Sequence, residues 1–141
     1  MAEASKTVEM PVPMEKLWGV INKFEDYPQF VEGVKSVKVL SRDGGKARVQ
    51  FGVQLLGKDI NYTLDHTESG KGNISWKLVE SNVFKSNEGS WSLRDLGGGR
   101  TEVTYRLSLD FKIFVPGMIL NGLVKSSLPK MLEQFQGRAG S

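Results

Sequence analysis

The most strongly patterned stretch of the chain lies near its C-terminus, in residues 115–135, with the sequence VPGMILNGLVKSSLPKMLEQF. Apolar residues recur there at helical spacing, namely Ile119, Leu123, Met131 and Phe135, flanked by Leu120, Val124, Leu128 and Leu132. This pattern predicts one amphipathic helix of roughly 20 residues, about 30 Å long, with Pro116 at its first position. Because Pro129 removes a backbone hydrogen bond inside that helix, we expect a kink or break within a turn of Pro129. Residues 116–124 would then cover a cavity, and residues 131–135 would pack on a sheet.

The N-terminal part of the chain combines a strand with two short helices. Residues 5–12 alternate loosely between polar and apolar side chains and predict a first strand. Pro13 then opens a helix whose apolar residues follow helical spacing as far as Phe24. Pro28 disfavours helical geometry in the residue before it, so a second short helix begins there and ends at Gly33.

From Val34 onward the apolar residues alternate with a period of two, which is typical of half-buried strands. Turn signals rich in glycine separate the alternating runs, and residues 83–89 lack a clear pattern. One face of these runs carries Val49, Phe51, Val53, Ile60, Tyr62, Leu64, Ile74, Trp76, Leu78, Trp91, Leu93, Val103, Tyr105, Leu107 and Leu109. Short turns between successive strands predict an antiparallel sheet of about seven strands, with its apolar face toward the helix.

Composition narrows the class of protein. A chain of 141 residues, 39% hydrophobic and 25% charged, is typical of a soluble globular protein, and we interpret residues 1–141 as one domain. The net charge of +3 is spread among acidic residues, so no binding to DNA is expected. The absence of cysteine excludes disulfides and suits a cytoplasmic location. The N-terminal residues do not have the pattern of a secretory signal, so we expect none, and the longest apolar run is too short to span a bilayer.

The order of strand, two short helices, antiparallel meander and long helix resembles the START-like superfamily (SRPBCC, Bet v 1-like). The residues that carry the resemblance are Phe24-Glu-Asp-Tyr-Pro-Gln-Phe-Val, Val34-Lys-Ser-Val-Lys-Val-Leu and Leu128-Pro-Lys-Met-Leu-Glu. The chain is most similar to the polyketide cyclase/dehydrase and coenzyme Q-binding branch, which includes ribosome-associated toxin-like proteins. The resemblance implies an α+β helix-grip fold, in which a curved antiparallel sheet wraps a long C-terminal helix. It also implies a cavity between sheet and helix that holds a lipid, a quinone or a polyketide.

The candidate ligand-binding residues face each other across that expected cavity, from the sheet and from the first half of the terminal helix. They are Phe51, Val53, Tyr62, Leu64, Trp76, Trp91, Tyr105, Leu107, Ile119, Leu120 and Leu123. A filled apolar core is the simpler alternative. Two features favour a cavity: the tyrosine and tryptophan side chains carry polar atoms that need a partner, and a curved sheet facing one helix leaves space that side chains do not easily fill.

No residue is assigned a catalytic role. His66, the one histidine, lies at the end of a strand on its inward side, and we expect it near solvent or bonded to a turn. Motifs for a nucleophile, a metalloprotease or a phosphate-binding loop are missing from the sequence. One histidine and no cysteine make a metal site or other cofactor unexpected. If the protein is an enzyme of the cyclase/dehydrase type, Tyr62, His66 and Tyr105 are the candidates for proton transfer.

Basic residues of the terminal helix suggest a macromolecular partner. Lys125 and Lys130, flanked by Lys112 and Arg138, are candidates for transient contact with an anionic membrane surface or with the ribosome, and a solvated helix face is the simpler interpretation. The leading hypothesis is a non-enzymatic protein that binds a hydrophobic small molecule. A polyketide cyclase or aromatase and a ribosome-associated interaction module are the alternatives.

Overall fold

The computed structural model describes residues 2–55 and 57–140. The elements are β1 (Ala2–Met10), α1 (Met14–Asn22), the 3₁₀ turn η1 (Phe24–Asp26), α2 (Tyr27–Phe30), β2 (Val34–Asp43), β3 (Lys46–Leu55), β4 (Lys58–Glu68), β5 (Asn73–Ser81), β6 (Phe84–Gly97), β7 (Arg100–Phe111), α3 (Gly117–Gly122), the π-helical segment η2 (Leu123–Ser127) and α4 (Leu128–Ala139). This order confirms the predicted α+β fold, with two short helices between the first and second strands.

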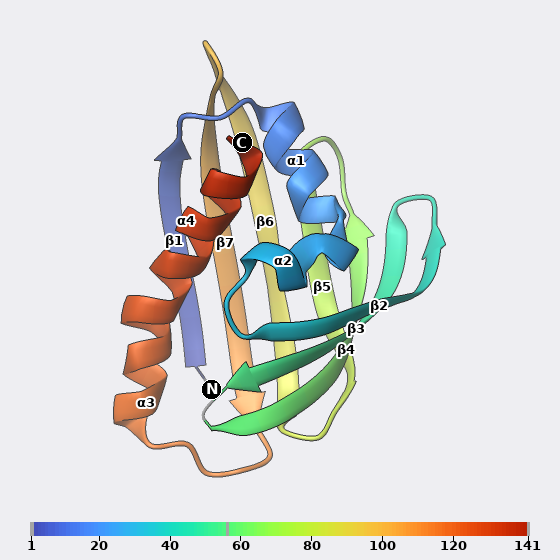
Figure 1. The fold of residues 1–141 in the computed structure, drawn as a ribbon, viewed down its shortest axis with the longest axis vertical. Coiled ribbons are helices and arrows are strands. Elements are labelled where there is room, and N and C mark those ends of the chain that lie inside the picture. The colour runs from blue at the N-terminus through green and yellow to red at the C-terminus, as the bar shows by residue number, and fades with distance from the viewer. Residues whose placement is uncertain (1, 56, 141) are drawn as a thin grey trace.

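The strands form one seven-stranded antiparallel sheet in the order β1-β7-β6-β5-β4-β3-β2. Strands β2 to β7 are neighbours in chain order, whereas β1 pairs with β7 and forms the edge of the sheet opposite β2. Figure 1 shows α4 lying along the sheet in front of β1 and β7, while α1 and α2 lie over the neighbouring part of the same face. The helices therefore cover one face of the sheet, as the helix-grip arrangement requires.

The sheet is strongly curved. Register shifts interrupt the pairing of β2 with β3 on both sides of the Ser36–Val39 stretch, and another lies between Thr63 and Leu64 of β4. Such bulges bend a strand and increase its twist. Figure 1 shows the result, with β2, β3 and β4 crossing in front of β5 and β6 at a steep angle. The curvature creates a concave inner face.

The C-terminal helix changes its type along its length. It begins at Gly117, with Pro116 as the preceding cap residue, and runs through α3 into η2 and then α4. In η2 the backbone N–H of Leu128 donates to the carbonyl of Leu123, five residues earlier. The interruption expected near Pro129 is thus a π-helical turn that ends just before it, and the chain continues in helical geometry through Leu128. Proline cannot supply the α-type bond to the carbonyl four residues back, which accounts for the place of this irregularity.

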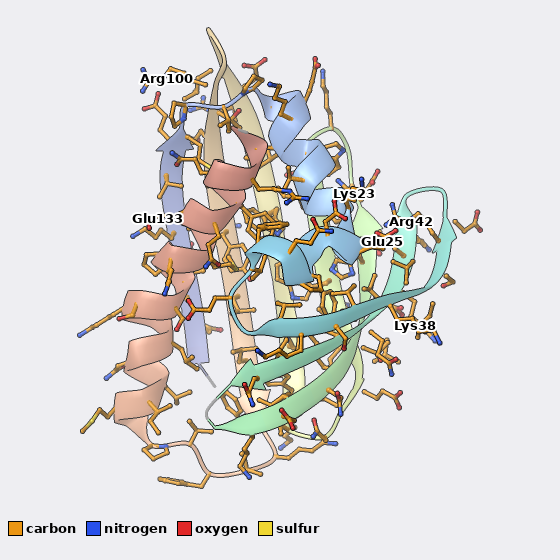
Figure 2. All side chains as sticks on the ribbon, in the orientation of Figure 1. Lys23, Glu25, Lys38, Arg42, Arg100 and Glu133 are labelled. Carbon is orange, nitrogen blue, oxygen red and sulfur yellow. The ribbon has the colours of Figure 1, made fainter. Side chains whose placement is uncertain are left out.

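The two halves of that helix are buried to different degrees. Within α4 the side chains of Leu128, Leu132, Phe135 and Ala139 are buried, whereas no residue of α3 is. On the outer face of α4, Glu133 points away from the sheet (Figure 2). The second half of the helix is therefore the part that packs on the sheet, as expected for residues 131–135.

Strand β6 begins earlier than the sequence pattern indicates. It includes residues 84–89, which showed no alternation, because a register shift at its start and a buried Asn87 interrupt the pattern. Gly89 pairs with Trp76 of β5, and the indole ring of Trp76 lies over the Gly89 backbone. A side chain at position 89 would meet that ring and the carbonyl of Arg106. Glycine at this position makes room for the tryptophan inside the sheet.

Replacing Gly89 with alanine is expected to destabilise the protein by about 1–3 kcal/mol, since the new Cβ overlaps the Trp76 ring and a backbone oxygen. Urea unfolding measures the change. Gly19→Ala in α1 is the matched control, because no neighbouring atom lies within 4 Å of the place that its new Cβ would take, and alanine favours a helix by about 0.5–1 kcal/mol. Equal stability of the Gly89→Ala variant and the wild type would contradict the close contact.

Candidate functional site

Two hollows lie between the inner face of the sheet and the helices. The inner chamber has a volume of about 210 Å³ and the outer hollow about 490 Å³. They share the lining residues Val31, Val34, Tyr62, Tyr105, Leu107, Leu109 and Met131. Because one set of side chains borders both, the two hollows adjoin and form the candidate site.

The inner chamber has aromatic walls. Phe51 and Tyr62 are stacked with ring centroids 5.1 Å apart and an interplanar angle of 19°. On the other side of the sheet's inner face, the ring centroid of Tyr105 lies 4.8 Å from that of Trp91 and 5.6 Å from that of Trp76. Rings held in this way provide flat, rigid apolar surface, which suits a planar or hydrocarbon ligand.

The outer hollow lies between the loop after α2 and the C-terminal helix. Glu32 of that loop forms an ion pair with Lys130, and its backbone N–H donates to Oε1 of Gln134 at 3.1 Å. All three residues line the hollow. Both charged side chains are largely exposed, so the ion pair contributes less than about 1 kcal/mol and holds this wall only weakly.

Most of the candidate residues from the sheet lie where the sequence placed them. Those that line the inner chamber are Phe51, Tyr62, Leu64, Trp76, Trp91, Tyr105 and Leu107. Val53 lines the outer hollow only. The alternation along each strand, together with the pairing of β3 to β7, brings these side chains onto one concave face.

The three candidate residues from the helix lie in three different environments. Leu123 lines the outer hollow, whereas Leu120 borders a smaller hollow of about 40 Å³ beside Ala4 and Leu109. Ile119 is 43% exposed and lines neither hollow. Successive helical residues are rotated by about 100°, so with Leu120 turned inward Ile119 lies on an outer side.

His66 differs from expectation. It was expected near solvent, but it is 6% exposed and lines the inner chamber. The 3₁₀ turn η1 covers this end of β4, and the ring of Phe24 lies 4.5 Å from the imidazole. Burial lowers the pKa of His66 to about 4; nearby Asp65 opposes this shift and Arg42 adds to it. The imidazole is therefore neutral at neutral pH.

The polar atoms in the chamber are only partly satisfied. Trp76 donates from Nε1 to Oδ1 of Asn87 at 3.0 Å. Among the residues that the structure describes, Nδ1 of His66 has no hydrogen-bond partner, and the hydroxyls of Tyr62 and Tyr105 form no hydrogen bond. Burial raises the pKa of both tyrosines, which keeps their hydroxyls protonated. The chamber thus combines apolar walls with a few groups able to form hydrogen bonds.

Several residues that line the inner chamber were not among the predicted ligand-binding residues. They come from α2 and the segment after it, from β4, β6 and β7, and from α4: Tyr27, Val31, Val34, His66, Phe84, Asn87, Leu109, Met131 and Phe135. Tyr27 is held by a hydrogen bond from its hydroxyl to the carbonyl of Ile21 and by edge contact with Phe135 at 5.2 Å. The aromatic run around Tyr27 and Phe30 was the signal that could have indicated a second wall.

A further hollow, of about 670 Å³, lies on the outward-facing side of the sheet. Its lining includes Ser75, Lys77, Glu88, Ser90 and Arg106. These residues alternate with the apolar residues of their strands and lie on the polar face of the sheet. A polar hollow there is what the solvated face of an antiparallel sheet ordinarily shows. The site between sheet and helices is the better candidate, because ligand pockets are predominantly apolar and concave.

The fold and this site define a START-like protein of the SRPBCC superfamily. The chain belongs to the family described as polyketide cyclase / dehydrase and lipid transport, which it matches over residues 10–136. Over 139 residues it is 22% identical to the ribosome association toxin RatA of Escherichia coli K12, covering 99% of this chain and 87% of that protein.

Solved structures support the same fold. A START superfamily protein from Mycobacterium smegmatis aligns with a TM-score of 0.88 and 23% identity over 99% of this chain and 98% of the other. The Zhui aromatase/cyclase from Streptomyces sp. R1128 aligns with a TM-score of 0.86 and 16% identity over 98% and 93%. At these identities the likeness concerns the fold alone.

None of the helices in residues 2–55 and 57–140 has the length and apolar character needed to cross a bilayer. Within the same residues, no three histidine, aspartate or glutamate side chains gather in a way that could hold a metal ion.

The buried His66 predicts a specific loss of stability in acid. The pKa of His66 is about 4 in the folded protein and about 6.5 in an unfolded chain. Protonation therefore favours the unfolded state, so the stabilisation is complete above pH 6.5 and is lost as the pH falls toward 4. The loss is about 3 kcal/mol.

Urea unfolding of the wild type and of His66→Gln between pH 7.5 and pH 4 measures this loss. The wild type should lose about 3 kcal/mol more than the variant, since glutamine does not titrate. Titration of exposed carboxylates affects both proteins alike and cancels in the comparison. The same pH dependence in both proteins would mean that His66 is not buried in its neutral form.

Proposed function

We propose that this protein binds a hydrophobic small molecule, such as a lipid, a quinone or a polyketide, in the inner chamber and the outer hollow. The observation that carries the proposal is the pair of adjoining hollows with shared apolar walls between sheet and helix. The inner chamber alone is smaller than ordinary ligand pockets, which measure roughly 300–1,000 Å³, whereas the outer hollow lies within that range. A ligand of ordinary size would therefore extend through both.

The distribution of polar atoms favours one orientation of the ligand. Around the inner chamber, the buried Nδ1 of His66 has no hydrogen-bond partner among the described residues, and the hydroxyls of Tyr62 and Tyr105 form no hydrogen bond with those residues. A carbonyl or hydroxyl on the inner end of a ligand would satisfy them at little cost, because buried polar groups are otherwise penalised. The apolar remainder would then lie along Leu107, Leu109 and Met131 toward the outer hollow.

Filling the junction of the two hollows should weaken ligand binding. Leu107 borders both, so Leu107→Trp is expected to weaken uptake of a fluorescent fatty acid or a short-chain quinone by at least about tenfold through steric exclusion. Leu96→Trp is the matched control, because Leu96 is exposed near the end of β6. Fluorescence titration gives the affinities, and native mass spectrometry shows whether a ligand co-purifies.

The proposal of ligand binding fails if the wild-type protein carries no ligand and takes up neither lipid nor quinone. It also fails if Leu107→Trp, folded as judged by circular dichroism, binds the probes as tightly as Leu96→Trp does.

A cyclase or aromatase is the second candidate function. Its support is the neutral imidazole of His66 in the same chamber as the protonated Tyr62 and Tyr105, since cyclisation of a polyketide needs a base and hydrogen-bond donors to its carbonyls. Turnover of a poly-β-ketone substrate that falls by about 10²-fold or more in His66→Gln would support this role. Absence of turnover by the wild type, or turnover unaffected by His66→Gln and Tyr105→Phe, would count against it.

A ribosome-associated module in the cytoplasm is the third candidate. It rests on the match to the ribosome association toxin RatA across nearly the whole chain. Salt-sensitive co-sedimentation with large ribosomal subunits is the expected result. A protein that remains in the supernatant at low salt would not have this function.

A further inference from the structure

Four large apolar side chains are exposed on one short part of the chain, the loop after β7 and the start of the C-terminal helix. Phe114 and Met118 are 84% and 85% exposed, and Ile119 and Val124 are 43% and 39% exposed. We call these four residues the apolar tip. Single exposed apolar residues are common on proteins, but four of them within eleven consecutive residues, two of them this exposed, indicate an interaction surface.

The charged side chains within the segment that carries the apolar tip are all lysines, although Glu3 of β1 borders the small hollow beside Val124. Residues 111–132 contain Lys112, Lys125 and Lys130 and no aspartate or glutamate. Lys130 is paired with Glu32, whereas Lys125 has no ion-pair partner among the described residues. Lys112 donates to the carbonyl of Ser81 at 2.7 Å, which ties the loop to the end of β5 while leaving the lysine's charge without a carboxylate partner.

The tip also adjoins the mouth of the candidate site. Leu123 directly precedes Val124 of the tip in the sequence and lines the outer hollow together with Ser126 and Ser127. Figure 1 shows α3 and the loop before it at the lower end of the molecule, below the N-terminal end of α4. A surface that receives the tip would therefore lie close to the opening of the outer hollow.

We propose that the apolar tip docks on the surface of an anionic lipid bilayer, with Phe114 and Met118 inserted among the acyl chains and Lys112 and Lys125 at the level of the headgroups. Aliphatic, phenyl and thioether side chains beside lysines fit the boundary between headgroups and hydrocarbon. Recognition of RNA would call for arginines and stacking rings along a basic groove, and residues 111–132 contain no arginine. Docking brings the outer hollow to the membrane, where a hydrophobic ligand can enter or leave.

Sedimentation with vesicles tests the docking. Binding is expected to vesicles of equal parts phosphatidylcholine and phosphatidylglycerol, and to weaken in high salt, because screening reduces the attraction of lysines to phosphate. The double variant Phe114→Ser/Met118→Ser should bind at least about tenfold more weakly. The double variant Lys112→Gln/Lys125→Gln should lose the preference over vesicles of phosphatidylcholine alone.

Matched controls come from other exposed positions. Leu40→Ser/Leu96→Ser changes two apolar residues that are 45% and 41% exposed outside the tip and should bind as the wild type does. Lys38→Gln removes a lysine of β2 that lies on the other side of the molecule from α3 in Figure 2, and it should also leave binding unchanged.

A site-specific label gives a second readout that does not depend on sedimentation. Because the chain has no cysteine, Met118→Cys and Leu96→Cys each offer one attachment point for a polarity-sensitive dye. With anionic vesicles the dye at position 118 should shift its emission to the blue, as expected on transfer to an apolar environment, and the dye at position 96 should not.

The docking proposal is overturned if the wild type binds neither kind of vesicle, if the Phe114→Ser/Met118→Ser variant binds them as well as the wild type, or if the dye at position 118 shows no shift. Self-association or ribosome binding that depends on Phe114 and Met118, without vesicle binding, would assign the tip to that partner instead. These outcomes are independent of ligand binding, because uptake of a soluble short-chain quinone does not require a vesicle.

Discussion

The inner face of a curved seven-stranded sheet is larger than one helix can cover, and the rest of this structure follows from how that face is shared. The covered part is organised around Phe135 of α4. Its ring contacts Trp91 at 4.9 Å, Phe30 at 5.1 Å and Tyr27 at 5.2 Å, so one side chain joins α4, α2 and the centre of the sheet. Aromatic pairs at such distances contribute about 0.5–1.5 kcal/mol each beyond the area they bury. On the N-terminal side of this cluster, α4 is preceded by the π-helical segment η2. There the sheet's inner face borders the two hollows instead of a dry core.

The general layout could be predicted from the sequence because it depends on periodicity. Alternation placed Phe51, Tyr62 and Tyr105 on one face of the sheet, and the pairing of strands then brought them to the same chamber. What could not be predicted depends on contacts between distant segments. His66 is buried because η1 covers the end of its strand, and the early start of β6 is hidden because Asn87 occupies an inward position to accept the hydrogen bond from Trp76. In both cases a polar residue on the inner face has the sequence signature of an exposed one.

The site has two regions of different chemistry. Around the inner chamber, hydrogen-bonding groups lie among aromatic rings, and burial moves the pKa of His66 down while it moves those of Tyr62 and Tyr105 up. All three side chains are therefore neutral over the physiological range of pH, which lets them remain in an apolar environment without a counter-ion. The outer hollow is bordered by the exposed pair of Glu32 and Lys130, whose charges stay in water. A neutral interior with a charged rim admits an uncharged or weakly polar molecule more readily than an ion.

The π-helical turn has a consequence for the lengths of sequence that this fold tolerates. A π turn holds about one residue more than an α turn, so η2 behaves as a one-residue insertion within the helix. Deleting one residue within it would restore ordinary helical spacing and rotate everything before it by about 100° relative to α4. Leu120 would turn away from the small hollow beside Ala4, and Met118 and Phe114 would point along a different side of the molecule. The direction in which the side chains of α3 and of the loop before it point is thus set by the number of residues between Gly122 and Pro129, independently of which side chains those residues carry.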